Sequence, residues 1–182
     1  LGDITDALWT LEHRREIGEP VRNWHYTGRA FSINRNQVGF PPPFEVVRED
    51  SDLATYWRIY VRVAEDAQNG SLGEPLRRMP WDFAAAVQGD VDAYNQGGRL
   101  RGQMPAGYYV DLTELALDYG WTRDVATNDW RNSFNGRSYW VFQKREGLAW
   151  YDAMRELYAE SQLGGFVPTP TPAPIPTLTQ QP

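Results

Sequence analysis

The first apolar pattern of the chain has helical spacing. Ile4, Leu8 and Leu11 recur at i, i+4 and i+7, which is the pattern of an amphipathic helix. Gly18 and Pro20 favour an end to this helix, because glycine and proline both interrupt helical backbone. We therefore expect an N-terminal helix that ends near Gly18.

Four apolar runs have the composition of β-strands. They lie between turn signals at residues 29–34, 44–49, 56–63 and 138–143. The strongest is the third, in which aromatic and β-branched residues alternate with Arg58 and Arg62. Asn69 and Gly70 follow it and predict a turn.

The second half of the chain predicts short helices. One begins at Trp81, one covers residues 90–96, one follows a capping-box-like start at Asp111, and one covers residues 148–160. The predicted apolar face of the third comprises Leu112, Leu115, Ala116 and Tyr119. Gly120 is expected to end that helix.

Helices and strands are mixed without strict alternation along the chain. This order favours an α+β fold, with a mainly antiparallel sheet and helices packed on it. We expect one globular domain over residues 1–165, because a segment of different composition begins at Phe166.

The last segment, residues 166–182, alternates proline with threonine, alanine and isoleucine. Such a segment is expected to form an extended polyproline-type tail or linker. Pro/Thr-rich stalks are typical of secreted proteins, so we expect an extracellular or cell-surface location. The candidate glycosylation sites are Thr169, Thr171, Thr177 and Thr179, and a plain spacer remains the alternative.

Composition narrows the classes of partner. The 182 residues carry a net charge of −6, which argues against nucleic acid, because phosphate binding needs a basic surface. The chain has no cysteine, which excludes disulfides and thiolate metal sites. No apolar run reaches the roughly 18 residues of a transmembrane segment. The aromatic share of 14% is expected to serve mainly the core.

Residues 22–33, RNWHYTGRAFSI, carry the one chemical motif. They resemble the pattern HxxGxAxD of the D-alanyl-D-alanine carboxypeptidases and the hedgehog signalling domain, which share an α+β fold. His25, Gly28 and Ala30 match the pattern, whereas Ser32 stands where the family has a zinc-binding aspartate. Residues 130–134 (WRNSF), 147–150 (GLAW) and 153–158 (AMRELY), together with the Pro/Thr-rich tail, also resemble uncharacterised secreted envelope proteins of thermophilic bacteria.

The resemblance implies a zinc site that this chain does not complete. A catalytic zinc site needs three protein ligands, and a serine hydroxyl is a poor substitute for a carboxylate. The catalytic glutamate and second histidine of the family's downstream motif are absent around Trp140. We therefore expect no cofactor, with His25 as the only candidate metal ligand. Zinc enters only if the chain is a peptidase.

A vestigial or ligand-binding site is expected around this motif. Its candidate residues are Arg22, Trp24, His25, Gly28, Arg29, Ser32 and Trp140. Two alternatives stay open. His25 is either a ligand or a structural hydrogen-bonding group. Arg22 and Arg29 either grip a carboxylate in bidentate fashion or form ion pairs.

The sequence thus favours a non-catalytic, extracellular cell-surface domain with a peptidase-like scaffold. Its expected partners are wall glycan or peptide, or further copies of itself in a filament or layer. The alternative is a zinc-dependent peptidoglycan D,D-carboxypeptidase. A third hypothesis is a domain that presents another part of a longer polypeptide.

Overall fold

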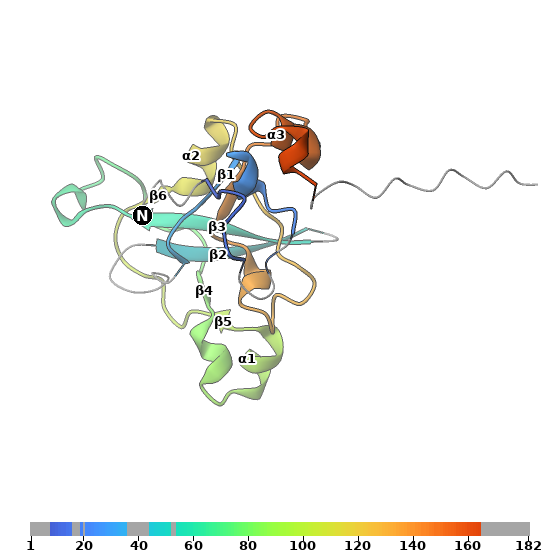
Figure 1. The fold of residues 1–182 in the computed structure, drawn as a ribbon. Coiled ribbons are helices and arrows are strands. Elements are labelled where there is room, and N and C mark those ends of the chain that lie inside the picture. The colour runs from blue at the N-terminus through green and yellow to red at the C-terminus, as the bar shows by residue number, and fades with distance from the viewer. Residues whose placement is uncertain (1–7, 16–18, 20, 36–43, 52–53, 165–182) are drawn as a thin grey trace, which may run out of the picture.

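All strand pairs in the part of the chain that the structure describes are antiparallel. The computed structural model describes residues 8–15, 19, 21–35, 44–51 and 54–164. Strands and short helices are mixed along these ranges (Figure 1), which confirms the predicted α+β class. Among the described helices, none has the length and apolar character that a membrane span requires.

The longest strands form the first sheet. β2 (Phe44–Ser51) pairs with β3 (Ala54–Arg62), which in turn pairs with β6 (Tyr109–Asp111). Val46 lies opposite Ile59 in this register, and both side chains are fully buried. The two predicted strands at 44–49 and 56–63 are therefore confirmed: β3 buries alternate residues, whereas the first four residues of β2 are all buried.

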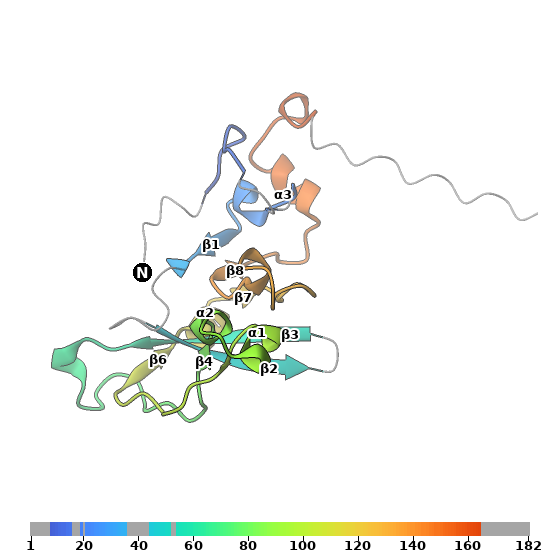
Figure 2. The same ribbon diagram turned by 90° about the horizontal axis from the view of Figure 1, so that it is seen from below.

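The second sheet contains the motif. Its order is β1 (Ala30–Ser32), β8 (Val141–Gln143) and β7 (Thr122–Arg123), with Ser32 opposite Val141. The predicted strands at 29–34 and 138–143 are thus present but shorter. In Figure 2 this sheet lies between the first sheet and the last helix. A two-stranded ladder joins β4 (Trp81–Asp82) to β5 (Arg99–Leu100).

Three short α-helices are described: α1 (Val91–Gln96), α2 (Leu112–Asp118) and α3 (Trp150–Arg155). Asp90 and Asp111 cap the first two, because each carboxylate accepts backbone N–H groups of the first turn. The described 3-10 helices are η2 (Trp24–Thr27), η4 (Glu65–Ala67), η5 (Ala84–Val87), η6 (Asn135–Arg137) and η7 (Glu160–Gln162).

The predicted N-terminal helix is absent from residues 8–15, and residues 1–7 and 16–18 lie outside the described range. The backbone N–H of Trp9 instead donates to the carbonyl of His25 at 3.1 Å. Of the predicted apolar positions, Leu11 packs against a buried cluster together with Trp9, whereas Leu8 is exposed, so the described part of the segment does not present a helical apolar face.

Two further helix predictions need correction. Trp81 begins strand β4 and not a helix, because its backbone pairs with Leu100. On α2 the buried side chains are Thr113 and Ala116, while Leu115 is exposed. Thr113 faces inward because its hydroxyl accepts the backbone N–H of Ile59 at 2.9 Å.

The buried side chains form two clusters. The larger joins the first and second sheets and is rich in aromatic residues, among them Trp57, Trp130 and Phe142. The smaller joins η2 to α3 through Trp24, Tyr26, Ala153 and Met154, among other residues. The motif therefore lies where these two clusters meet.

Candidate functional site

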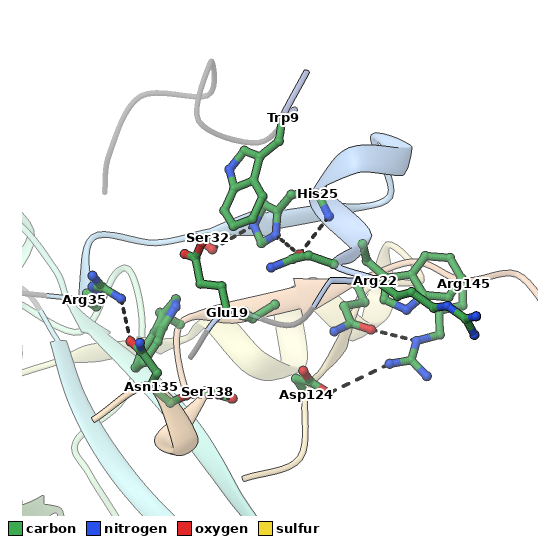
Figure 3. Close-up of a pocket in the computed structure, with 15 residues that line it drawn as sticks. Trp9, Glu19, Arg22, His25, Ser32, Arg35, Asp124, Asn135, Ser138 and Arg145 are labelled. Carbon is green, nitrogen blue, oxygen red and sulfur yellow. Dashed lines mark hydrogen bonds and ion pairs between the residues drawn. The ribbon is translucent and has the colours of Figure 1, made fainter. Parts of the chain in front are cut away.

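A pocket of about 220 Å³ lies beside η2 and strands β1 and β8. Figure 3 shows Arg22 and Arg145 at one end, and Arg35 with Asn135 at the other. The side chains that line it are Trp9, Glu19, Arg22, Asn23, Trp24, His25, Ser32, Arg35, Asp124, Asn135, Ser138, Trp140, Val141, Gln143 and Arg145. This volume is below the roughly 300–1,000 Å³ of typical drug-sized ligand sites, so it suits a small group or a chain end.

The two ends of η2 position the residues on one side of the pocket. Asn23 caps η2, because its side-chain oxygen accepts the backbone N–H of His25 at 3.1 Å. Gly28 ends η2 with a φ of 66°, a left-handed conformation that favours glycine. The chain then enters β1, and this turn carries Ser32 back toward His25.

His25 is held at both ring nitrogens. Its Nδ1 lies 2.7 Å from Oδ1 of Asn23, and its Nε2 lies 2.9 Å from the hydroxyl oxygen of Ser32. Oδ1 of Asn23 already accepts a backbone N–H, so it is the amide oxygen, and Nδ1 is the ring donor. Nε2 is then the acceptor, and the Ser32 hydroxyl donates to it.

The environment of His25 keeps its ring neutral. The side chain is only 2% exposed and stacks on Trp9, with ring centroids 4.6 Å apart. Burial, with a smaller effect of the charge on His13, lowers the pKa of His25 to about 4. These contacts favour the structural hydrogen-bonding interpretation of His25 over the metal-ligand one.

Arginines give the pocket a positive balance in a negatively charged chain. Three arginines and two acids, Glu19 and Asp124, line it. The guanidinium of Arg35 lies 5.3 Å from the Trp140 ring centroid, and that of Arg145 lies 5.1 Å from the Trp24 centroid. Burial raises the pKa of the Asp124 carboxyl, while the nearby Arg145 guanidinium acts in the opposite direction.

Arg22 differs from the other two arginines of the pocket. It is exposed, and it forms no hydrogen bond or ion pair with any residue that the structure describes. A guanidinium in this state has its donors available for a ligand, and planar carboxylates match those donors in bidentate fashion.

Five of the seven candidate residues from the sequence gather here. Arg22, Trp24, His25, Ser32 and Trp140 all line the pocket, with Trp24 and Trp140 largely buried.

Gly28 and Arg29 do not line the pocket. Gly28 serves the turn. Arg29 takes the ion-pair alternative, since its guanidinium pairs with Glu146 and, at 2.8 Å, with Glu156. The carboxylate-gripping role that the sequence offered to both arginines is therefore open only to Arg22.

Sequence reasoning missed most of the remaining lining residues. Asp124 and Arg145 lie in the loops after β7 and β8, and Asn135 begins η6, so no local pattern connects these residues to the motif. Ser138 is notable only in the structure, where its φ is 52°, a value that is uncommon for residues other than glycine. The sequence around it does not indicate this conformation. The capping role of Asn23 could have been predicted from the sequence, because asparagine is a preferred residue at the position before a helical turn.

The donors around His25 do not fit the zinc that the resemblance implies. No group of three histidine, aspartate or glutamate side chains in the described ranges is arranged to hold a metal ion. Both ring nitrogens of His25 are engaged, and His13 stacks on Trp9 at 4.0 Å and makes no described contact with Ser32. The candidate glycosylation sites of the tail lie outside the described residues.

A second, larger cavity of about 670 Å³ lies near β3 and β6. Its arginines are paired within the chain: Arg58 with Asp111 at 2.6 Å, Arg78 with Glu49 at 2.8 Å, and Arg77 with Glu74. Because these charges already satisfy one another, the cavity offers a ligand less than the pocket at His25 does.

Comparison with known proteins adds no identification. No family model, curated protein or solved structure matches the chain. The likeness of residues 22–33 to the zinc carboxypeptidases therefore stays a prediction from the sequence.

Proposed function

We propose that this chain is an extracellular surface module that binds wall material through a carboxylate held in the pocket at His25. The group it would hold is the carboxylate at the end of a wall peptide or on a wall sugar. Arg22 is the observation that carries the proposal, because it is exposed in the pocket and makes no hydrogen bond or ion pair with a described residue.

The rest of the pocket suits such a ligand. Trp24 and Trp140 offer apolar surface beside the guanidinium groups, and Ser32 and Asn135 add polar groups for orientation. The small volume favours a terminal group over the middle of a polymer. Of the two versions that the sequence left open, this arrangement favours binding over self-assembly, and it does not depend on zinc.

An NMR titration tests the proposal with four probes. They are acetyl-D-alanyl-D-alanine, the C-terminal amide of that peptide, N-acetylmuramic acid and N-acetylglucosamine. Only the first and third carry a carboxylate, and the pair that binds identifies the peptide or the sugar as its source. We expect saturable shifts of indole signals with a carboxylate probe and none with its neutral partner.

Arg22→Gln should weaken that binding about tenfold, since a tenfold change corresponds to about 1.4 kcal/mol and charge-assisted hydrogen bonds contribute about that much. Arg29→Gln is the matched control, because Arg29 is paired outside the pocket. Equal binding of the neutral probes, or equal loss in both variants, would remove carboxylate recognition by Arg22 from the proposal.

A further inference from the structure

Three side chains at the pocket form one continuous chain of hydrogen bonds. The hydroxyl of Ser32 donates to Nε2 of His25, and Nδ1–H of His25 donates to Oδ1 of Asn23. The distances are 2.9 Å and 2.7 Å, both within normal hydrogen-bond range. A hydroxyl on an imidazole that a third group orients is the arrangement that activates a nucleophile.

Each member of this chain is fixed by the fold. Asn23 is held by its capping role at η2, and the His25 ring is stacked under Trp9. Ser32 is half-buried on β1, where its backbone pairs with Val141 of β8, and it lines the pocket. The hydroxyl is therefore reachable from the pocket while its base is shielded from solvent.

We propose that Ser32 is a nucleophile for acyl transfer from small esters, with His25 as its general base and Asn23 as a positioning residue. This activity goes beyond the proposed binding function and shares only the pocket with it. It also replaces the expectation, drawn from the sequence, of a domain without catalysis.

The reaction needs no partner besides water. Oγ of Ser32 forms a bond to the ester carbonyl carbon while its proton moves to Nε2 of His25. The bond from that carbon to the leaving oxygen then breaks, and Nε2 returns the proton to the leaving alcohol. Water next attacks the acyl-serine, His25 takes and returns one proton, and the free acid leaves with Ser32 restored.

The surroundings of His25 favour esters over amides. Asn23 is neutral, so it orients the ring without stabilising the positive charge that the ring gains, and burial also disfavours that charge. An amine leaving group depends on strong protonation, whereas an alkoxide or phenoxide leaves with less help. The guanidinium groups of Arg22 and Arg35 lie at opposite ends of the pocket, and the positive charge they give it would favour the developing oxyanion.

The test uses a fluorophosphonate probe and p-nitrophenyl acetate on the full chain. We expect the probe to add once, at Ser32 by peptide mapping, and the ester to turn over at least about a hundredfold faster than with Ser32→Ala. Ser71→Ala, on an exposed turn away from the pocket, should behave as the unchanged chain.

Asn23→Asp separates positioning from structure. Aspartate is also a capping residue, so η2 should keep its fold, but its carboxylate stabilises the charged ring. Hydrolysis and probe addition should then rise about tenfold, which a merely structural asparagine would not produce. Asn23→Ala should lower both.

Two outcomes would overturn the inference: no adduct, or an adduct that persists in Ser32→Ala. If the unchanged chain binds a carboxylate but forms no adduct, the proposal that Ser32 is a nucleophile fails and the proposed binding function stands. If it forms the adduct at Ser32 but binds no carboxylate probe, the inference stands and the binding function fails.

Discussion

The indole Nε1 of Trp150 donates a hydrogen bond to the backbone carbonyl of Asn23 at 2.9 Å, across 127 residues of sequence. This bond joins the start of α3 to the residue that caps η2 and orients His25. The smaller buried cluster therefore packs η2 against α3 and also holds one wall of the pocket in place.

Trp150→Phe should destabilise the chain by about 1–2 kcal/mol, because it removes this hydrogen bond and some buried area. Urea unfolding followed by circular dichroism measures the change. Tyr119→Phe is the control, since Tyr119 is 69% exposed and should leave the unfolding midpoint unchanged. A midpoint of Trp150→Phe equal to that of the original chain would show that the bond does not support η2.

Gly28→Val should destabilise the chain by about 1–3 kcal/mol, because a β-branched residue strains a backbone with φ of 66°. Steric crowding contributes little to this destabilisation, since a Cβ at this position would lie 3.6 Å from Leu8 and 3.7 Å from Leu157, which are ordinary van der Waals distances. Gly102→Ala, where a Cβ meets nothing within 4 Å, serves as the control. An unchanged melting temperature of Gly28→Val would contradict the left-handed turn.

Stability should fall with acidity in a window set by His25. The folded pKa is about 4, against about 6.5 in the unfolded chain, so the fold binds fewer protons in between. The contribution is complete above pH 6.5, declines as pH falls, and is lost below about pH 4. The difference corresponds to about 3 kcal/mol.

The measurement is the free energy of unfolding between pH 7 and pH 4, with the same series for His25→Asn. Carboxyl groups contribute to both series, and the histidine contributes only to the first. If the two slopes agree between pH 6.5 and pH 4, His25 is not the buried neutral ring described here.

Zinc should have no effect on the chain. Elemental analysis of protein purified without chelators should find less than one zinc per chain, and added zinc should leave the melting temperature unchanged, because ligand binding to the folded state would raise it. A stoichiometric zinc that His25→Asn removes would restore the peptidase hypothesis.

Local sequence patterns determined the parts of the fold that depend on neighbours along the chain. The alternation at 56–63 specified a strand with one buried face, and β3 covers most of it. Asp90 and Asp111 predicted where two helices begin, because a capping carboxylate accepts hydrogen bonds from the backbone N–H groups of the turn that directly follows it. Gly28 likewise marked the turn before β1.

Tertiary structure decided the rest, because it depends on partners far away in sequence. Leu8 and Leu11 have helical spacing, yet Trp9 between them packs over His25 and the described segment is not a helix. Trp81 has no local signal for a strand, and its partner is Leu100.

The site divides in the same way. His25 and Ser32 stood in one short motif, so the sequence alone brought them to attention as a pair. The sequence did not show that the two side chains are hydrogen-bonded to each other. It also did not show that Asp124, Asn135 and Arg145 complete the pocket. A short motif determines which side chains are close to one another along the chain. The packing of separate segments determines which other side chains lie opposite them in the pocket.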